Sequence, residues 1–132
     1  MEPAVPGSHA LGGWHGAMNM RVVHASAERV EIALDVGPEH LQPHGIVHGG
    51  VYCGLVESVC SIGASLAAQG APVMGLENQT SFLRAVRAGA LTAVGVPLHV
   101  GRTSQLWSAE VRDAEGRLVA SGRLRLLKPD AS

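Results

Sequence analysis

The chain has 132 residues and a formal net charge of −1, a length that suits one domain whose core buries about two-thirds of the unfolded surface. Charged residues make up only 16% of it, against about a quarter in an average globular protein, so we expect part of the surface to be covered by another copy of the chain. No basic cluster is present, which argues against binding to nucleic acid or to a membrane surface.

Neither a secretory signal nor an apolar run typical of a membrane span stands out, so we expect a cytoplasmic protein. Cys53 and Cys60 share one apolar segment at a spacing that predicts buried thiols rather than disulfides or zinc ligands. Three histidines spaced by four lie between positions 40 and 48, but Pro43 and Gly45 break any helix that would align them. We therefore expect no metal site.

The N-terminal stretch, residues 1–16, is rich in proline and glycine and predicts an irregular lead-in to a domain over 17–128. Within this domain the pattern favours a strand over 17–25 and a second one over 29–36, where apolar residues alternate with polar ones. Residues 39–47 contain proline and glycine and predict a loop.

A long helix is expected from about residue 49 to residue 69, because apolar residues recur at helical spacing and a glycine and a proline follow. Three or four strands come next, without a further helix, in the segments 73–86, 90–100, 106–112 and 117–127. One long central helix wrapped by an antiparallel sheet of five to six strands is an α+β architecture.

Glu57 is the one carboxylate in this apolar helix, and such a group is costly to bury unless it is paired or used. Cys53, Glu57 and Ser61 follow one another at intervals of four residues and form a polar stripe. Upstream, His48-Gly49-Gly50 predicts a turn that aims backbone N–H groups outward at the start of the helix. A carboxylate and an amide-lined helix end are two groups suited to attacking and polarising a carbonyl.

Two motifs resemble those of the hotdog-fold acyl-CoA thioesterases, in the subgroup of the phenylacetate-pathway, hydroxybenzoyl-CoA and enterobactin-associated enzymes. The first is LQPHGIVHGGVYCGLVESVCS, residues 41–61, and the second is VPLHVGRTSQLW, residues 96–107. The resemblance covers about residues 17–127. It implies the hotdog fold, hydrolysis of an acyl-CoA with an aromatic or medium-sized acyl group, no cofactor, and assembly into a homodimer and further into a homotetramer.

The resemblance also implies roles for individual residues. Gln42 matches a glutamine that orients the thioester, and His48 matches the histidine that opens the glycine turn. Gly49 matches the amide that polarises the carbonyl, Glu57 the catalytic carboxylate, and Ser61 the hydroxyl that positions the attacking water. Positions near the coenzyme A phosphates in relatives correspond to Arg84, Arg102, Thr103 and Ser104. Phe82 and Ala85 depart from the residues that several relatives have there, which bears on acyl specificity.

Helix geometry predicts where the two halves of such a site come from. Gly49 and Glu57 are eight residues apart, which is about 12 Å of helix rise, so one thioester carbonyl cannot contact both on the same helix. Two helices that run antiparallel about a two-fold axis bring Gly49 of one chain to Glu57 of the other. Glu57 then acts either as a general base on water or as a nucleophile that forms a mixed anhydride.

Other interpretations stay open at this point. Glu57 is also compatible with a structural carboxylate satisfied by a backbone or hydroxyl donor. The same fold also serves proteins that bind or sense acyl-CoA without turning it over, and hydratases or dehydratases that act on enoyl-CoA. Release of free thiol from a panel of acyl-CoA thioesters distinguishes these functions.

Overall fold

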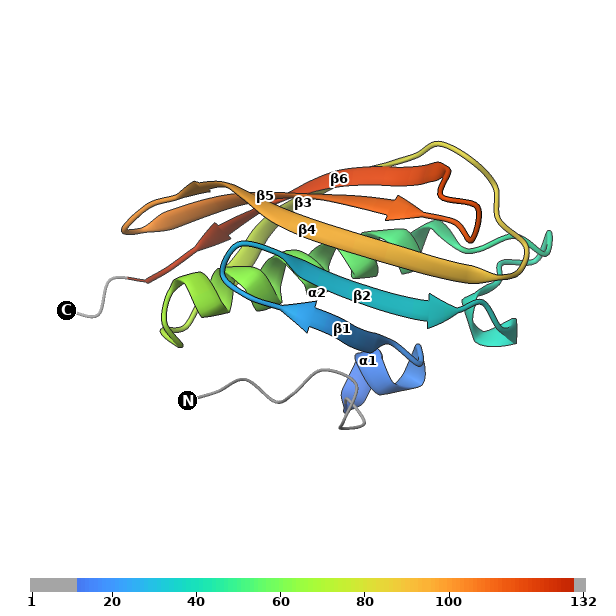
Figure 1. Ribbon diagram of the computed structural model, residues 1–132, viewed down its shortest axis with the longest axis horizontal. Coiled ribbons are helices and arrows are strands. Elements are labelled where there is room, and N and C mark those ends of the chain that lie inside the picture. The colour runs from blue at the N-terminus through green and yellow to red at the C-terminus, as the bar shows by residue number, and fades with distance from the viewer. Residues whose placement is uncertain (1–11, 130–132) are drawn as a thin grey trace.

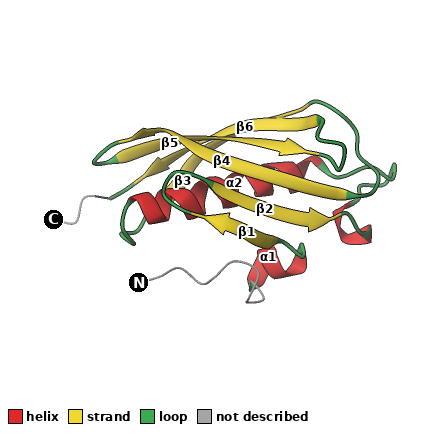
Figure 2. Cartoon of the chain, viewed as in Figure 1, coloured by secondary structure: helices red, strands yellow, loops and turns green. Residues whose placement is uncertain are grey.

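The computed structural model describes residues 12–129 as two layers, with one long helix lying against the inner face of a curved antiparallel sheet (Figures 1 and 2). The helices are α1 Gly13–Ala17 and α2 Gly49–Ala67, with a 3-10 turn at Pro38–His40. The strands are β1 Arg21–Ala25, β2 Val30–Asp35, β3 Met74–Phe82, β4 Ala90–Val100, β5 Ser104–Arg112 and β6 Leu118–Leu127.

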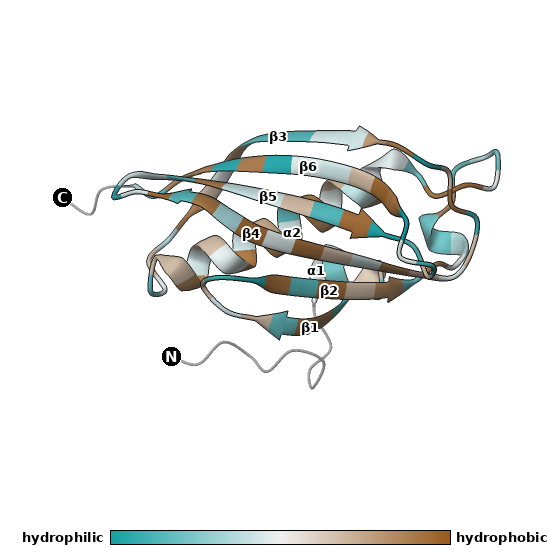
Figure 3. Ribbon diagram, turned by 45° about the horizontal axis from the view of Figure 1, so that its top comes forward, coloured by the Kyte–Doolittle hydropathy of each residue, from teal (hydrophilic) through white to brown (hydrophobic). Residues whose placement is uncertain are grey.

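The six strands form one sheet in the order β1-β2-β4-β5-β6-β3, with every neighbouring pair antiparallel. After α2 the chain enters the sheet at its far edge, so β3 pairs only with β6, and β1 and β3 are the two edges (Figure 3). Between Gly75 and Glu77 the register of β3 against β6 shifts by one residue, a bulge that strands often carry beside functional sites. An unpaired edge of nine residues is therefore exposed along β3.

Helix α2 supplies most of the contact between the layers. Its residues Leu55, Val56 and Val59 are fully buried against the sheet, and the indole of Trp107 fills the space beside Gly63 where any Cβ would collide. Its length and hydropathy would also suit a membrane-spanning helix, but half of that segment is buried inside this fold. The apolar character of α2 thus serves the core of the domain.

The predicted architecture is confirmed, with one long helix and six strands in the expected order and the long helix ending two residues earlier than predicted. The N-terminal lead-in differs from the prediction. Gly13–Ala17 form a short helix, most of which lies in the stretch 1–16 that was predicted to be irregular, and the following strand starts only at Arg21. The remainder of that prediction, for residues 1–11, lies outside the described residues. The strand expected over 73–86 ends at Phe82, where the chain turns toward Gly89.

Candidate active site

The start of α2 is capped in a way that leaves one amide available. His48 has the extended backbone of an N-cap residue, and its Nδ1 accepts the N–H of Gly50 at 2.8 Å. The carbonyl of His48 accepts the N–H of Val51 at 2.9 Å. Among the hydrogen bonds of residues 12–129, none is donated by the Gly49 N–H, which lies at the positive end of the helix dipole. This amide can receive a carbonyl oxygen from a ligand.

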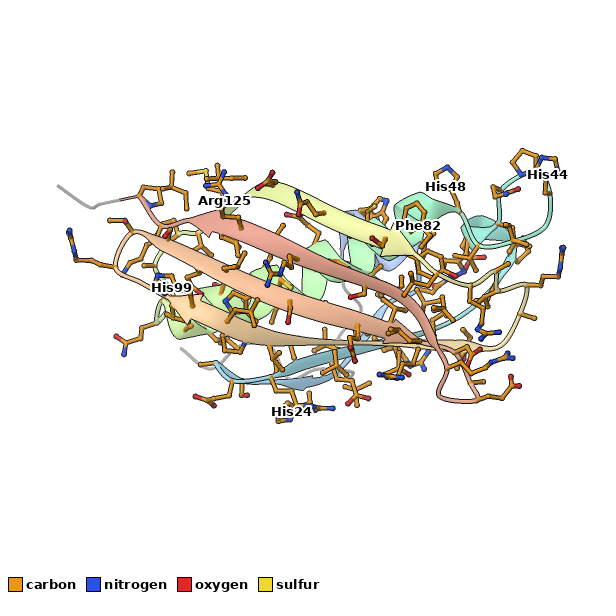
Figure 4. The ribbon with its side chains drawn as sticks, turned by 90° about the horizontal axis from the view of Figure 1, so that it is seen from above. His24, His44, His48, Phe82, His99 and Arg125 are labelled. Carbon is orange, nitrogen blue, oxygen red and sulfur yellow. The ribbon has the colours of Figure 1, made fainter. Side chains whose placement is uncertain are left out.

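The ring of Phe82, at the end of β3, lies directly over Gly49. A Cβ built on Gly49 would lie 2.5 Å from Cε2 of Phe82, so a side chain at this position would require the half-exposed ring to move. Phe82 also packs against Tyr52 with the ring centroids 5.9 Å apart, and its side chain is near that of His48 at the same end of the molecule (Figure 4). The glycine predicted from the motif thus lets the Phe82 ring pack closely on the start of α2.

A pocket of about 380 Å³ opens beside this turn and brings three predicted site residues together. Gln42, Gly49 and Arg84 all line it. The turn from Gln42 to Gly45 is closed by a 2.9 Å hydrogen bond from the Gly45 N–H to the Gln42 carbonyl, and the Gln42 side chain accepts the N–H of His44. The pocket therefore combines a bare helix amide, a side-chain amide and an exposed guanidinium.

Tyr52 lines the same pocket with its hydroxyl buried and without a hydrogen-bond partner within residues 12–129. Burial, with a smaller contribution from the negative charge of Asp113, raises the pKa of Tyr52 to about 12. The phenol is therefore neutral at physiological pH, and its ring supports Phe82 from within the core.

Glu57 lies two turns further along α2, where its side chain is half-buried and held by β3. The Asn78 amide donates to Glu57 Oε1 at 3.2 Å and to the carbonyl of Cys53 at 2.9 Å. The hydroxyl of Thr80 donates to Asn78 Oδ1 at 2.7 Å, which fixes the amide in the orientation that points its NH₂ group at the carboxylate. Neither Asn78 nor Thr80 was predicted from the sequence as a site residue.

Gly75 completes the surroundings of the carboxylate from the bulged part of β3. A Cβ on Gly75 would overlap Oε2 of Glu57, so the second carboxylate oxygen occupies space that only glycine leaves free. Strand β3 therefore touches both predicted chemical groups, with Phe82 at the Gly49 end and Gly75 and Asn78 at the Glu57 end.

A second pocket, of about 460 Å³, surrounds Glu57 and is roofed by α1. His15 Nε2 lies 2.8 Å from the hydroxyl of Ser58, and the indole of Trp14 packs on the backbone of Gly54. The remaining lining residues are Cys53 and Asn78. Sequence reasoning missed this roof because it treated the residues around Trp14 as an irregular lead-in.

The other predicted residues lie apart from these two pockets. Ser61 is half-exposed one turn beyond Glu57. Within the described residues, the side-chain hydrogen bond to Glu57 comes from Asn78 and not from Ser61. Arg102 and Thr103 lie in the turn between β4 and β5 and Ser104 begins β5, at the opposite end of the molecule from the start of α2 (Figure 1). One chain therefore does not bring Arg84 and Arg102 into one pocket.

The cysteines and histidines make no metal site in residues 12–129, where no group of three potential ligands occurs. Cys60 is fully buried, and burial together with the nearby charge of Glu57 raises the pKa of its thiol to about 12. His40 is also fully buried, with Nδ1 accepting the Gly37 N–H at 2.9 Å and Nε2 2.7 Å from the carbonyl of Met18. This histidine ties the loop before α2 to the end of α1.

The two pockets share no lining residue, which agrees with the separation predicted from helix rise. A single chain offers an amide that can polarise a carbonyl in one pocket and a carboxylate that can activate water in the other.

The comparisons with known proteins agree with this chemistry. A model of the thioesterase superfamily matches residues 44–120. The 1,4-dihydroxy-2-naphthoyl-CoA hydrolase of Escherichia coli is 35% identical over 114 residues, covering 86% of this chain and 84% of that protein. The proofreading thioesterase EntH of Cronobacter sakazakii is 36% identical over 96 residues, covering 72% of this chain and 70% of the relative. A solved thioesterase of Haemophilus influenzae has a TM-score of 0.81 at 31% identity, covering 86% of this chain and 80% of its own. The chain therefore belongs to the thioesterase superfamily of thioester hydrolases and has the hotdog fold.

Proposed function

We propose that this protein hydrolyses an acyl-CoA thioester to a carboxylic acid and free coenzyme A at a site formed by two protomers together. The observation that carries the proposal is the arrangement along the edge strand β3. Its Phe82 end packs on Gly49, whose amide is available, and its Gly75 end contacts the Glu57 carboxylate. Each protomer thus has both halves of a thioesterase site, but in separate pockets.

Pairing of two β3 edges about a two-fold axis would join these halves. Strands related by such an axis run antiparallel, so the Gly49 end of one protomer meets the Glu57 end of the other. Four large apolar side chains on or next to this edge are about half exposed in the single chain, which supports its burial by a second copy: Met74, Leu76, Phe82 and Leu83. The homodimer thereby contains two equal sites.

In such a site the Gly49 N–H donates a hydrogen bond to the thioester oxygen and stabilises the oxyanion as the carbonyl carbon is attacked. Along the first route the partner's Glu57 takes a proton from water, the resulting hydroxide bonds to the carbonyl carbon, the C–S bond breaks, and the thiolate of coenzyme A takes up the proton. Along the second route the carboxylate itself attacks, the thiolate leaves, and water hydrolyses the mixed anhydride. The half-buried carboxylate held by Asn78 suits either route.

The coenzyme A portion would extend from the Gly49 pocket, where Arg84 is exposed and able to meet a phosphate. The two-fold arrangement also carries the partner's turn around Arg102, Thr103 and Ser104 toward this same end. Exposed Val96, Leu98 and Val100 on β4 support a further interface, through which two dimers assemble into a tetramer.

The acyl group that we propose is aromatic or medium-sized. Support comes from a relative whose name specifies a 1,4-dihydroxy-2-naphthoyl-CoA substrate and from a 460 Å³ pocket beside Glu57, which is in the range of small-ligand sites.

Mixed dimers test the shared site. Glu57→Gln removes the carboxylate, and Gly49→Pro removes the amide hydrogen at the first helical position, where proline is tolerated. The extended backbone of His48 is compatible with a following proline, and Phe82→Ala in the same chain makes room for the ring. We expect each variant alone to release almost no thiol, and their purified mixed dimer to regain about half of the wild-type rate, because one of its two sites is intact.

A mixed dimer without activity would overturn the shared site, provided that Gly49→Ala/Phe82→Ala, which keeps the amide, stays active. Tight binding of acyl-CoA without thiol release by the wild type would instead indicate a binding or sensing protein. Hydration of an enoyl-CoA without thiol release would indicate a hydratase.

A further inference from the structure

Helix α1 is a part of the molecule that the thioesterase motifs do not account for. It lies before residue 44, where the match to the family model begins, yet it covers the pocket that holds Glu57. We infer that Trp14 and His15 of α1 select the acyl group, and that they favour a flat aromatic acyl group bearing a hydroxyl over an alkyl chain. The inference rests on the proposed thioesterase function and deepens it.

Trp14 offers an aromatic surface beside the carboxylate. The edge of its indole sits on Gly54 so closely that no Cβ is possible there, and this contact fixes where the ring lies. The side chain is nevertheless 46% exposed, and it meets the His15 ring in an edge arrangement with the centroids 6.2 Å apart. A large aromatic side chain left half exposed over a pocket is a suitable stacking surface for a planar ligand.

His15 and Ser58 supply hydrogen-bonding groups on the same wall. Their 2.8 Å contact joins α1 to α2 one residue after Glu57, and Ser58 is almost completely buried. Imidazole and hydroxyl groups can each donate and accept, so the pair can bind a substrate hydroxyl while remaining bonded to each other. An alkyl chain cannot form such a hydrogen bond, so an acyl group with a hydroxyl gains a contact here that an alkyl chain lacks.

The position of Glu57 sets the direction of the acyl group. The carbonyl carbon must come within reach of this carboxylate, so the acyl group attached to it enters the surrounding space, which Trp14, His15 and Ser58 share with Glu57. That space of about 460 Å³ is large enough for one or two fused rings. The residues that touch the ring therefore come partly from α1.

Matched substitutions at Trp14 test the stacking role. Trp14→Phe keeps an aromatic face, whereas Trp14→Leu keeps an apolar side chain without one. We expect the Phe variant to retain the ratio of kcat/KM for benzoyl-CoA to that for hexanoyl-CoA, and the Leu variant to lower this ratio about 3- to 10-fold. Equal loss on both thioesters, or no loss, in the Leu variant would overturn the inference.

His15→Leu tests the polar part of the wall. We expect the preference for 4-hydroxybenzoyl-CoA over benzoyl-CoA to fall about 10-fold, since a hydroxyl left without its partner is rejected. An unchanged preference would remove His15 from substrate selection. Val23→Ala serves as control, because Val23 is an exposed residue of β1 that lines neither pocket, and it should change none of these ratios.

Binding measurements separate this inference from the proposed function. S-Phenacyl-CoA carries a methylene between carbonyl and sulfur and cannot be hydrolysed as a thioester, and S-hexyl-CoA is its alkyl counterpart. Trp14→Leu should weaken binding of the first compound by about 3- to 10-fold and leave the second unchanged. If the wild type hydrolyses no thioester, the proposed function fails, and this pair of dissociation constants still decides whether α1 recognises an aromatic group.

Discussion

Around Gly49 the group available for chemistry belongs to the backbone, whereas around Glu57 it is a side chain whose surroundings come from two other elements, β3 and α1. The Gly49 amide is available because His48 accepts the two following N–H groups, those of Gly50 and Val51, and leaves the first one free. Glu57 instead depends on Asn78 from β3, on the space left by Gly75, and on the roof that α1 provides. One half of the site is local in sequence and the other is assembled by tertiary packing.

This difference has consequences for how each half tolerates change. A backbone donor at a helix start is insensitive to most distant substitutions, since the helix itself fixes it. A carboxylate held by a strand and a separate short helix responds to changes in either of them. We therefore expect distant substitutions to reduce activity mainly through the Glu57 half.

Removing the carboxylate should have the largest effect. Glu57→Gln keeps the size of the side chain and its place beside Asn78 but abolishes the base or nucleophile, so we expect kcat to fall 10²- to 10⁴-fold. Thiol release from an acyl-CoA panel measures it, with circular dichroism and sedimentation to verify fold and assembly. A fall of less than tenfold in a folded, assembled variant would assign the chemistry to another residue.

Removing the amide donor should have the next largest effect. In a Phe82→Ala background, Gly49→Pro and Gly49→Ala both add carbon at the same position, but only proline lacks the N–H. We expect the proline variant to be about 10²- to 10³-fold slower than the alanine variant, the usual contribution of one oxyanion donor. Equal rates would mean that the Gly49 amide does not contact the oxyanion.

Asn78 should have a smaller but specific effect. Asn78→Leu removes the donor to Glu57 Oε1, so the carboxylate is no longer held in one orientation, and we expect kcat to fall about tenfold with KM nearly unchanged. Thr80→Val removes only the hydrogen bond that orients the amide and should give a weaker effect of the same kind. A change confined to KM would instead indicate that Asn78 contacts the substrate.

The fold and the Gly49 half could be predicted because their signals are local. Alternation in 29–36, helical spacing after residue 49 and the glycine turn each reflect short-range geometry. Asn78 and Thr80 were not predictable in this way, because residues 77–81 of β3 are all polar and no alternation marks its inner side. Trp14 and His15 were missed because the surrounding glycines obscured a five-residue helix. The catalytic and coenzyme A-binding roles, the dimer and tetramer, and the cytoplasmic location stay predictions.

The surroundings of Glu57 should also be visible in the alkaline stability of the fold. Cys60, buried behind Glu57, has its pKa raised from 9.0 to about 12 by burial and by that carboxylate. Folding thus favours the neutral thiol, a stabilisation that is complete below pH 9 and is lost as the pH rises toward 12. Between pH 7.5 and pH 10.5 the loss of this stabilisation should reduce the free energy of unfolding by about 2 kcal/mol. Cys60→Ala should remove that part of the pH dependence.

Urea unfolding at the two pH values measures this loss, and comparing slopes with pH rather than absolute stabilities corrects for the small cavity that alanine leaves. Glu57→Gln separates the two causes of the shift. Because burial is the larger cause, this variant should keep most of the alkaline loss and reduce only the part due to the charge. If the alkaline loss of stability disappeared completely in Glu57→Gln, the carboxylate rather than the surrounding apolar core would control the pKa of the Cys60 thiol. The Glu57 half of the site would then be more strongly coupled to the core than its contacts indicate.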